Sequence, residues 1–238
     1  MKSLIKRLIR RCGFDIRRYD PSTSEMAQLM TMFSGHGVNL VFDVGANIGQ
    51  FGRSLRDAGY RGRIVSFEPL SSAREQLLRQ SQSDQLWEVA PRGAIGSENG
   101  EIEIHIAGNS VSSSAMDMLA AHESAAPESA YIGSERTPLR RVDSIAGDYL
   151  RSDSVLFLKI DTQGYEEQVF AGTQGILDRI AGLQLELSLV PLYDGQRLFD
   201  DLVKQVAGAG FALWGLAPVF VDPQSGRLLQ VDATFFRS

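Results

Sequence analysis

The chain has 238 residues, of which 43% are hydrophobic and 22% charged, values that suit one large α/β domain with its own core. No apolar run approaches the roughly 20 residues that a membrane-spanning helix needs, and no apolar signal segment follows the basic N-terminus. A single cysteine, Cys12, excludes an internal disulfide, so we expect a reducing compartment and a cytoplasmic location.

Charge is distributed unevenly along the chain. The net charge is −5, yet the first 18 residues carry 7 basic residues and 1 acidic one, which leaves 17 basic and 28 acidic residues, about −11, in the remainder. Such an acidic body repels nucleic acid, so we expect no nucleic-acid partner. Residues 1–37 are interpreted as a basic amphipathic helix, over MKSLIKRLIRRCGF, and a lead-in. This helix either docks on the domain or frays, or it contacts an anionic membrane surface.

From residue 38 onward, apolar strand patterns alternate with amphipathic helices. Strands are predicted over Leu40–Val44, Arg63–Phe67, Leu86–Ala90, Glu101–Ile106, Leu139–Val142, Val155–Ile160, Leu183–Leu189, Phe211–Leu216 and Gln230–Phe236. Helices are predicted over Gly49–Ala58, Ala73–Gln80, Glu166–Leu177 and Leu198–Ala209. This alternation predicts a mostly parallel, doubly wound sheet. The last two strands have no helix between them, which predicts an antiparallel final strand.

One segment within the predicted domain 38–238 has no clear pattern. Residues 109–138 are rich in Ser and Ala and poor in large apolar side chains. Long irregular segments inside compact domains are usually functional or disordered, so we interpret this one as a substrate loop or lid.

A glycine-rich turn follows the first predicted strand, with the sequence Asp43-Val44-Gly45-Ala46-Asn47-Ile48-Gly49. Glycines four residues apart, with a small Ala46 between them, suit a backbone that a ligand approaches closely. The dinucleotide fingerprint instead has the spacing G-x-G-x-x-G, which leaves room for a pyrophosphate. A carboxylate such as Asp43 is a poor neighbour for a pyrophosphate and a good one for an amino-acid moiety. The turn therefore favours a ligand that carries such a moiety.

The second predicted strand ends in Phe67-Glu68-Pro69. Glu68 lies 19 residues after Gly49, close to the interval at which an acid meets ribose hydroxyls in nucleotide-binding α/β folds. Pro69 ends the strand and orients the carboxylate. These features favour a ribose-containing ligand, and an NAD(P)-dependent oxidoreductase or a non-catalytic protein that retains the fold remain alternatives.

Two further acids lie on the most apolar later strands. Asp161, in KIDTQGYE, is either a helix cap or a residue that faces the ligand cleft. Glu186 lies inside LQLELSLVPLY, where an acid is costly unless it is paired or ligating, so it is either functional or a buried partner of Lys159. The lone cysteine and three scattered histidines give no zinc site or thiol nucleophile, although His122 is kept as a minor candidate for a base.

Taken in order, these motifs resemble the FkbM family of S-adenosylmethionine-dependent methyltransferases. The resemblance covers about residues 38–237 and rests on VFDVGANIGQFG, FEP, NSVSSS, RRVDSI, FLKIDTQGYEEQVFAG, LQLELSLVPLY and FVDPQSGRLLQVDATFFR. It implies a Rossmann-like class I methyltransferase fold: a seven-stranded, mostly parallel sheet with an antiparallel last strand and helices on both faces. It also implies transfer of the sulfonium methyl to a hydroxyl of a sugar, as in a glycan or glycolipid precursor, or of a secondary metabolite.

The resemblance also assigns roles to the residues described above. The methionine part of the cofactor would lie against Asp43, Gly45, Ala46, Asn47 and Gly49. Glu68, followed by Pro69, would accept hydrogen bonds from both ribose hydroxyls.

For the chemical step, the resemblance places Asp161 beside the transferring methyl. The acceptor hydroxyl must lose its proton to a base or near a metal ion. Asp161 is the first candidate for that base and Glu186 the second, unless the two share a divalent ion. Many family members have Glu where this chain has Gln163, which leaves the role of Gln163 open.

Overall fold

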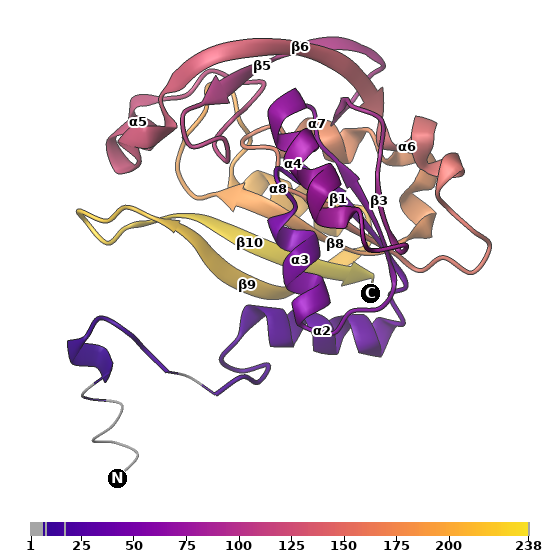
Figure 1. The fold of residues 1–238 in the computed structure, drawn as a ribbon, viewed down its shortest axis with the longest axis horizontal. Coiled ribbons are helices and arrows are strands. Elements are labelled where there is room, and N and C mark those ends of the chain that lie inside the picture. The colour runs from indigo at the N-terminus through magenta and orange to yellow at the C-terminus, as the bar shows by residue number, and fades with distance from the viewer. Residues whose placement is uncertain (1–6, 8, 17, 238) are drawn as a thin grey trace.

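The computed structural model describes residues 7, 9–16 and 18–237 and has at its centre a seven-stranded sheet in the order β3-β2-β1-β7-β8-β10-β9 (Figure 1). The strands of this sheet are β1 (Leu40–Val44), β2 (Arg63–Phe67), β3 (Trp87–Val89), β7 (Leu156–Ile160), β8 (Ile180–Ser188), β9 (Phe211–Val221) and β10 (Leu228–Arg237). All neighbouring pairs are parallel except those of β10, which runs antiparallel to both β8 and β9. The predicted fold class and the antiparallel last strand are confirmed.

Helices cover both faces of this sheet, as predicted. One face packs against α2 (Glu25–His36), α3 (Gln50–Asp57) and α4 (Ser71–Ser81). The other face packs against α6 (Val142–Ile145), α7 (Glu166–Ala171) and α8 (Phe199–Gly208). The residues of β1 and β7 are all buried, which explains why both strands read as nearly continuous apolar runs. Asp43 and Lys159 are the only charged residues in these two strands, and they are neighbours in register.

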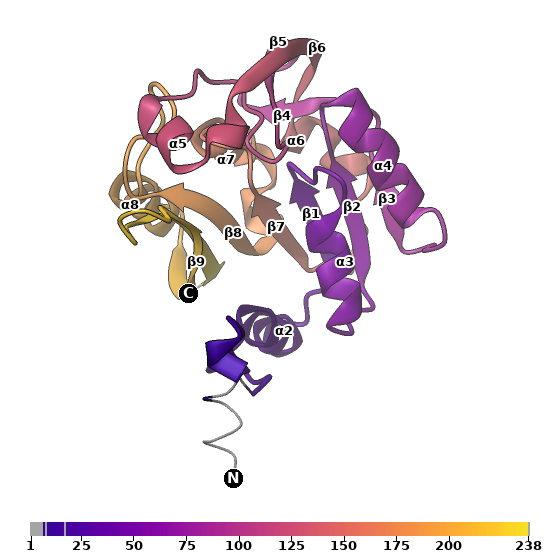
Figure 2. The same cartoon turned by 60° about the vertical axis from the view of Figure 1, so that its left-hand side comes forward.

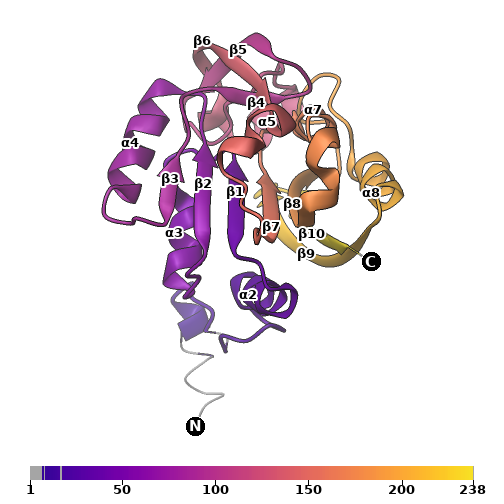
Figure 3. The ribbon, with the colours of Figure 1, turned by 90° about the vertical axis from the view of Figure 1, so that its right-hand side faces the viewer.

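A second sheet of three strands, in the order β4-β6-β5, lies beyond the ends toward which β1, β2 and β7 point (Figures 2 and 3). Its strands are β4 (Ala94–Gly96), β5 (Gly100–Ala107) and β6 (Tyr131–Arg141). The sequence did not indicate β4, and β6 begins at Tyr131 rather than at Leu139. Pro138 and Gly133 inside β6 are residues that normally argue against a strand, yet β6 is the central strand of this sheet.

The segment predicted to be an irregular loop, 109–138, is therefore largely structured. It contains α5 (Ala120–Ala125), a 3-10 turn (Pro127–Ser129) and the first part of β6. Residues 110–115, which precede α5, lie at the end of the main sheet where the cavity described below opens.

Two helices differ from their predictions. The sequence analysis did not predict α2, although Ser24 caps its first turn and Gly37 ends it in the left-handed conformation, which are recognisable signals. The helix predicted over Glu166–Leu177 is instead α7 followed by a 3-10 turn. At the break, a Cβ on Gly172 would lie 2.1 Å from the carbonyl oxygen of Gly96. The end of α7 therefore packs this closely against β4 because residue 172 is a glycine.

Half of the basic helix predicted over residues 1–14, namely residues 1–6 and 8, lies outside the described residues, and residues 7 and 9–11 are helical. Within the part of the chain that the structure describes, no helix is long and apolar enough to cross a membrane.

Candidate active site

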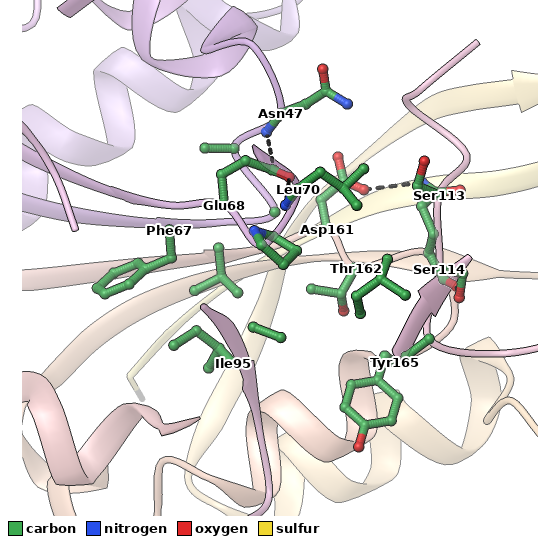
Figure 4. Close-up of a pocket in the computed structure, with 18 of the residues that line it drawn as sticks. Asn47, Phe67, Glu68, Leu70, Ile95, Ser113, Ser114, Asp161, Thr162 and Tyr165 are labelled. Carbon is green, nitrogen blue, oxygen red and sulfur yellow. Dashed lines mark hydrogen bonds between the residues drawn. The ribbon is translucent and has the colours of Figure 1, made fainter. Parts of the chain in front are cut away.

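A cavity lies at the carboxyl ends of β1, β2 and β7. Val44, Phe67 and Ile160 are aligned in register across these three strands, so the loops that follow all begin at the same edge of the sheet. Figure 4 shows Glu68 and Asp161 reaching this cavity from two of the strand ends. The lining includes Gly45, Ala46, Asn47, Glu68, Pro69, Lys159, Asp161 and Gln163, together with Ile102 and Ile104 of the second sheet and Ser110 to Ala115 in part.

The two glycines of the first turn are required by the packing of the chain itself. Gly45 has a φ of 77°, and a Cβ there would lie 1.7 Å from the carbonyl oxygen of Asp161. Gly49 has a φ of 95°, and a Cβ there would meet the side chains of Leu77 and Trp87. Gly45 lines the cavity, whereas Gly49 faces the core. Gly45 therefore allows the loop after β1 to pack against the loop after β7, and Gly49 allows close packing in the core.

Replacing Gly45 with alanine is expected to lower the free energy of unfolding by about 3 kcal/mol or more, because backbone strain and an overlap with backbone atoms add together. Gly59→Ala is the matched control: its φ is 95°, but a Cβ there meets nothing within 4 Å, so only the conformational cost of about 1–2 kcal/mol applies. Urea denaturation of both variants measures the difference. Equal losses at the two positions would show that Gly45 is not crowded.

Glu68 is buried at the end of β2 and holds the first turn in place. Its Oε2 accepts a hydrogen bond from the backbone N–H of Asn47 at 2.8 Å, and its Oε1 accepts one from the N–H of Leu70 at 2.9 Å (Figure 4). Burial raises the pKa of the Glu68 carboxyl to about 7, although both hydrogen bonds act in the opposite direction. Each oxygen retains lone-pair capacity, so the carboxylate can accept further hydrogen bonds from a molecule in the cavity.

Asp161 begins the turn that follows β7, and its side chain is 30% exposed in the cavity. Its Oδ2 accepts a hydrogen bond from Lys159 Nζ at 3.0 Å, and its Oδ1 accepts one from Gln163 Nε2 at 3.0 Å. The turn itself is fixed by Glu166, whose Oε1 accepts from the backbone N–H groups of Thr162 at 2.9 Å and Gly164 at 3.2 Å. Asp161 is thus an acid held in one orientation and open to the cavity.

Asp43 lies behind the cavity and does not line it. Its side chain is fully buried, accepts a hydrogen bond from the Ser66 hydroxyl at 3.3 Å and lies 3.9 Å from Lys159 Nζ. Burial raises the pKa of the Asp43 carboxyl. Burial alone would lower the pKa of Lys159, but the carboxylates of Asp161 and Asp43 more than offset this effect and raise it. A charged Lys159 therefore links Asp43 to Asp161, so Asp43 reaches the cavity through Lys159.

Glu186 is also buried and does not line the cavity. Its Oε2 accepts hydrogen bonds from Gln163 Nε2 at 2.5 Å and from Gln230 Nε2 at 2.9 Å. The predicted pairing of Glu186 with Lys159 is wrong, because Lys159 pairs with Asp161 and Asp43 instead. Burial raises the pKa of the Glu186 carboxyl well above its usual range. Glu186 is separated from the cavity by Gln163.

Comparison with known proteins places this site in a family. The family model described as "Methyltransferase FkbM domain" matches residues 43–213, which include the glycine turn, Glu68 and Asp161. The chain belongs to the FkbM methyltransferase family. This membership confirms the resemblance and supports S-adenosylmethionine-dependent methyl transfer as the activity of the protein.

Solved structures share the fold of this FkbM domain at low sequence identity. The fibrillarin/Nop5p complex is 13% identical, with a TM-score of 0.50, and the match covers 93% of this chain and 85% of that chain. Magnesium protoporphyrin IX methyltransferase from Synechocystis PCC 6803, solved with bound SAM, is 11% identical, with a TM-score of 0.47 and coverage of 100% and 97%. A search of curated protein sequences found no match.

The acids of the FkbM site do not form a site for a divalent ion. Among the residues that the structure describes, no group of three or more His, Cys, Asp or Glu side chains is placed to hold a metal. The amide of Gln163 stands between Asp161 and Glu186 and donates to both, and Glu186 does not line the cavity. The shared ion considered in the sequence analysis therefore does not fit this arrangement, and we derive no step through it.

The sequence identifies Asn47 as a site residue, but it assigns no role in the site to Ser110 or Lys159 and leaves that of Gln163 open. Asn47, Ser110 and Gln163 are the three non-glycine residues with positive φ in the described part of the chain, and all three line the cavity. Lys159 could have been assigned to Asp161, because residues two apart on a strand share a face. His122, by contrast, is buried against the rings of Tyr193 and Phe220, and burial lowers its pKa to about 4, so it is a neutral packing residue.

Proposed function

We propose that this FkbM domain transfers the methyl group of S-adenosylmethionine to a hydroxyl oxygen of a sugar, in a cell-surface glycan or glycolipid precursor, or of a secondary metabolite. The observation that carries the proposal is the placement of two carboxylates, Glu68 and Asp161, on the strands that flank β1, both facing one cavity. S-adenosylmethionine is an amino acid joined to a nucleoside. Glu68 suits the ribose of the nucleoside, and Asp161 suits the reacting centre.

The residues that line the cavity fit this cofactor. Glu68 would accept hydrogen bonds from the ribose hydroxyls, since each of its oxygens accepts only one backbone N–H. The backbone of the turn at 45–47 would lie against the methionine part, and the apolar side chains of Phe67, Leu70 and Ile95 suit the adenine ring. When bound, the cofactor supplies an electrophilic methyl on a sulfonium.

Methyl transfer to an alcohol is an in-line displacement, so much of its acceleration comes from orientation of the two reactants. The hydroxyl must also give up its proton as the carbon–oxygen bond forms. Two acids line the cavity, and Glu68 is assigned to the ribose. We therefore assign the role of general base to Asp161, which Lys159 and Gln163 hold in place. Glu186, the second candidate, does not line the cavity.

The remaining walls of the cavity support a neutral acceptor. Among the lining residues that the structure describes, the charged side chains are Glu68, Asp161 and Lys159, and Lys159 is paired with carboxylates. An anionic group on the acceptor would therefore find no unpaired cation. The rest of the lining is uncharged. It includes apolar side chains such as Ile102, Ile104 and Val111, the hydroxyls of Tyr165, Ser110, Ser113 and Ser114, and the amides of Asn47, Gln50 and Gln163. Such a surface suits a sugar or a polyketide-like molecule, which has both apolar faces and hydroxyls.

Cofactor affinity should depend on pH through Glu68. Ribose hydroxyls donate to the ionised carboxylate, so binding favours the ionised form, and the pKa of about 7 in the free protein leaves Glu68 half protonated at neutral pH. The dissociation constant of S-adenosylhomocysteine should therefore be constant above pH 8 and rise about tenfold for each pH unit below 7. Calorimetric titration at several pH values tests this. A Glu68→Gln variant should remove this dependence, and an equal slope in both proteins would contradict the assignment.

The experiment that tests the proposed function uses S-adenosylmethionine with an isotopically labelled methyl group and two acceptor pools, a cell-envelope glycan extract and a lipid-soluble metabolite extract. We expect the label to appear as a methyl ether in one pool. Label found solely as an amine or an ester would contradict transfer to a hydroxyl.

A further inference from the structure

Gln163 lies between Asp161, which faces the cavity, and the buried Glu186, and it takes no part in the proposed reaction. It is the third residue of the turn after β7, its φ is 55°, and its side chain is almost fully buried. A residue other than glycine in the left-handed region carries a conformational cost that the surroundings must offset. The contacts of Gln163 show what offsets it.

Every polar group of the Gln163 side chain has a partner. Nε2 donates to Asp161 Oδ1 at 3.0 Å and to Glu186 Oε2 at 2.5 Å. Oε1 accepts from the hydroxyl of Tyr193 at 2.7 Å. The backbone carbonyl of Gln163 accepts from the Ser114 hydroxyl at 2.6 Å, which ties the turn to the segment before α5. Through its side chain and its carbonyl, Gln163 therefore connects both acids to Tyr193 and to Ser114.

These partners fix the orientation of the amide. Tyr193 is buried, and burial raises its pKa, so its hydroxyl keeps its proton. The nearer of its two acceptors is Gln163 Oε1 at 2.7 Å, and the other is the Ser112 carbonyl at 3.3 Å. Rotating the amide by half a turn would place Oε1 against two carboxyl groups and Nε2 against a hydroxyl donor. The NH₂ group therefore points at the acids, with one N–H available to each.

A neutral amide satisfies both acids from this position, because it has two donors. A carboxyl group at residue 163 would remove both donors and place another acid next to Asp161 and Glu186. Like charges at such distances favour protonation of one of the acids. With an apolar side chain at residue 163, Asp161 would keep only its hydrogen bond from Lys159.

We propose that Gln163 is a positioning residue: its amide holds the carboxylate of Asp161 toward the cavity and separates it from Glu186. This inference rests on the proposed function, in which Asp161 takes the proton of the acceptor hydroxyl. Gln163 does not touch the reacting atoms, and it acts by holding the carboxylate of Asp161 in one orientation.

Two variants test the proposal with labelled S-adenosylmethionine and the acceptor extract that accepts label. Gln163→Met should lower the rate at saturating cofactor about 10–100-fold at every pH, while the KM for S-adenosylmethionine stays within about threefold. In Gln163→Glu, the pH below which the rate falls should be higher than in the wild type by about one unit or more, so that activity recovers above pH 8. Gln184→Met is the control, because Gln184 is equally buried but bonds to Thr234 and Glu25, and it should keep the wild-type profile.

A second measurement does not need an acceptor. Carboxyl-carbon NMR of protein labelled at glutamate, with the Glu186 signal assigned through Glu186→Gln, follows the titration of Glu186. Loss of the amide donor in Gln163→Met should move this titration to higher pH, whereas Gln184→Met should leave it unchanged. An unchanged Glu186 titration in Gln163→Met overturns the inference even if no acceptor is methylated. A wild-type rate profile in both Gln163 variants, or a rate loss matched by an equal loss of S-adenosylhomocysteine affinity, overturns it too.

Discussion

Replacing Asp161 with asparagine is expected to abolish methyl transfer while the affinity for S-adenosylhomocysteine stays within about threefold of the wild type. Asparagine keeps the shape of the side chain and can still accept a hydrogen bond from Lys159 or Gln163, but it cannot take a proton. Loss of a positioned base lowers rates by about 10²–10⁴-fold, so the labelled-methyl assay should show a fall in that range.

The matched control for this experiment is Asp178→Asn, which alters an exposed aspartate in the 3-10 turn before β8, away from the cavity. It should keep full activity. If Asp161→Asn also kept its activity, the base would have to be another group, and the role given to Asp161 would be wrong. If the variant lost activity and cofactor affinity together, Asp161 would be a binding residue and not the base.

The second large effect is expected at Glu68. Glu68→Gln should weaken the binding of S-adenosylhomocysteine by about 10–100-fold, because hydrogen bonds to a charged group contribute about 1.5–3 kcal/mol each. Glutamine can still accept from one of the backbone N–H groups of Asn47 and Leu70, but its own NH₂ must then face the other. The turn that carries Asn47 should therefore loosen as the ribose contact is lost.

Calorimetric titration measures this affinity, and a thermal melt of the same sample establishes that the variant is folded. Glu88→Gln serves as control, since Glu88 lies on the neighbouring strand β3 with its side chain 57% exposed. Affinity for S-adenosylhomocysteine should be unchanged in the control. A folded Glu68→Gln protein that binds as tightly as wild type would remove the ribose assignment.

The sequence predicted the main sheet well, because its signals are local and strong. Buried parallel strands such as β1 and β7 are apolar throughout, and the absence of a helix between β9 and β10 already required an antiparallel strand. The second sheet was harder to predict, since Pro138 lies in the middle of β6 and hides the strand. That strand becomes visible only through its register with β5, a long-range contact.

The candidate site was predictable as far as residue type and strand position decide it. Glu68 and Asp161 were identified because each follows a strand of the parallel sheet, and the register brings those strand ends together. The roles of Gly45 and Asp43 were not predictable in the same way. The close contact of Gly45 is with the backbone of a residue more than a hundred positions away, and Asp43 acts through Lys159 because both lie on one buried face.

The separation of Asp161 from Glu186 by one glutamine amide is likewise a three-dimensional feature. In the sequence, Gln163 stands out as a departure from the glutamate of many family members. In the structure it is the residue that donates to both acids.

The most direct test of the central claim is a calorimetric titration of one preparation of the wild-type protein with S-adenosylhomocysteine and, in parallel, with NADH. The cavity that Glu68 and Asp161 line should bind S-adenosylhomocysteine at a single site with micromolar affinity and should bind NADH at least about a hundredfold more weakly. A folded protein that binds NADH more tightly, or that gives no heat with S-adenosylhomocysteine at millimolar concentration, would contradict it.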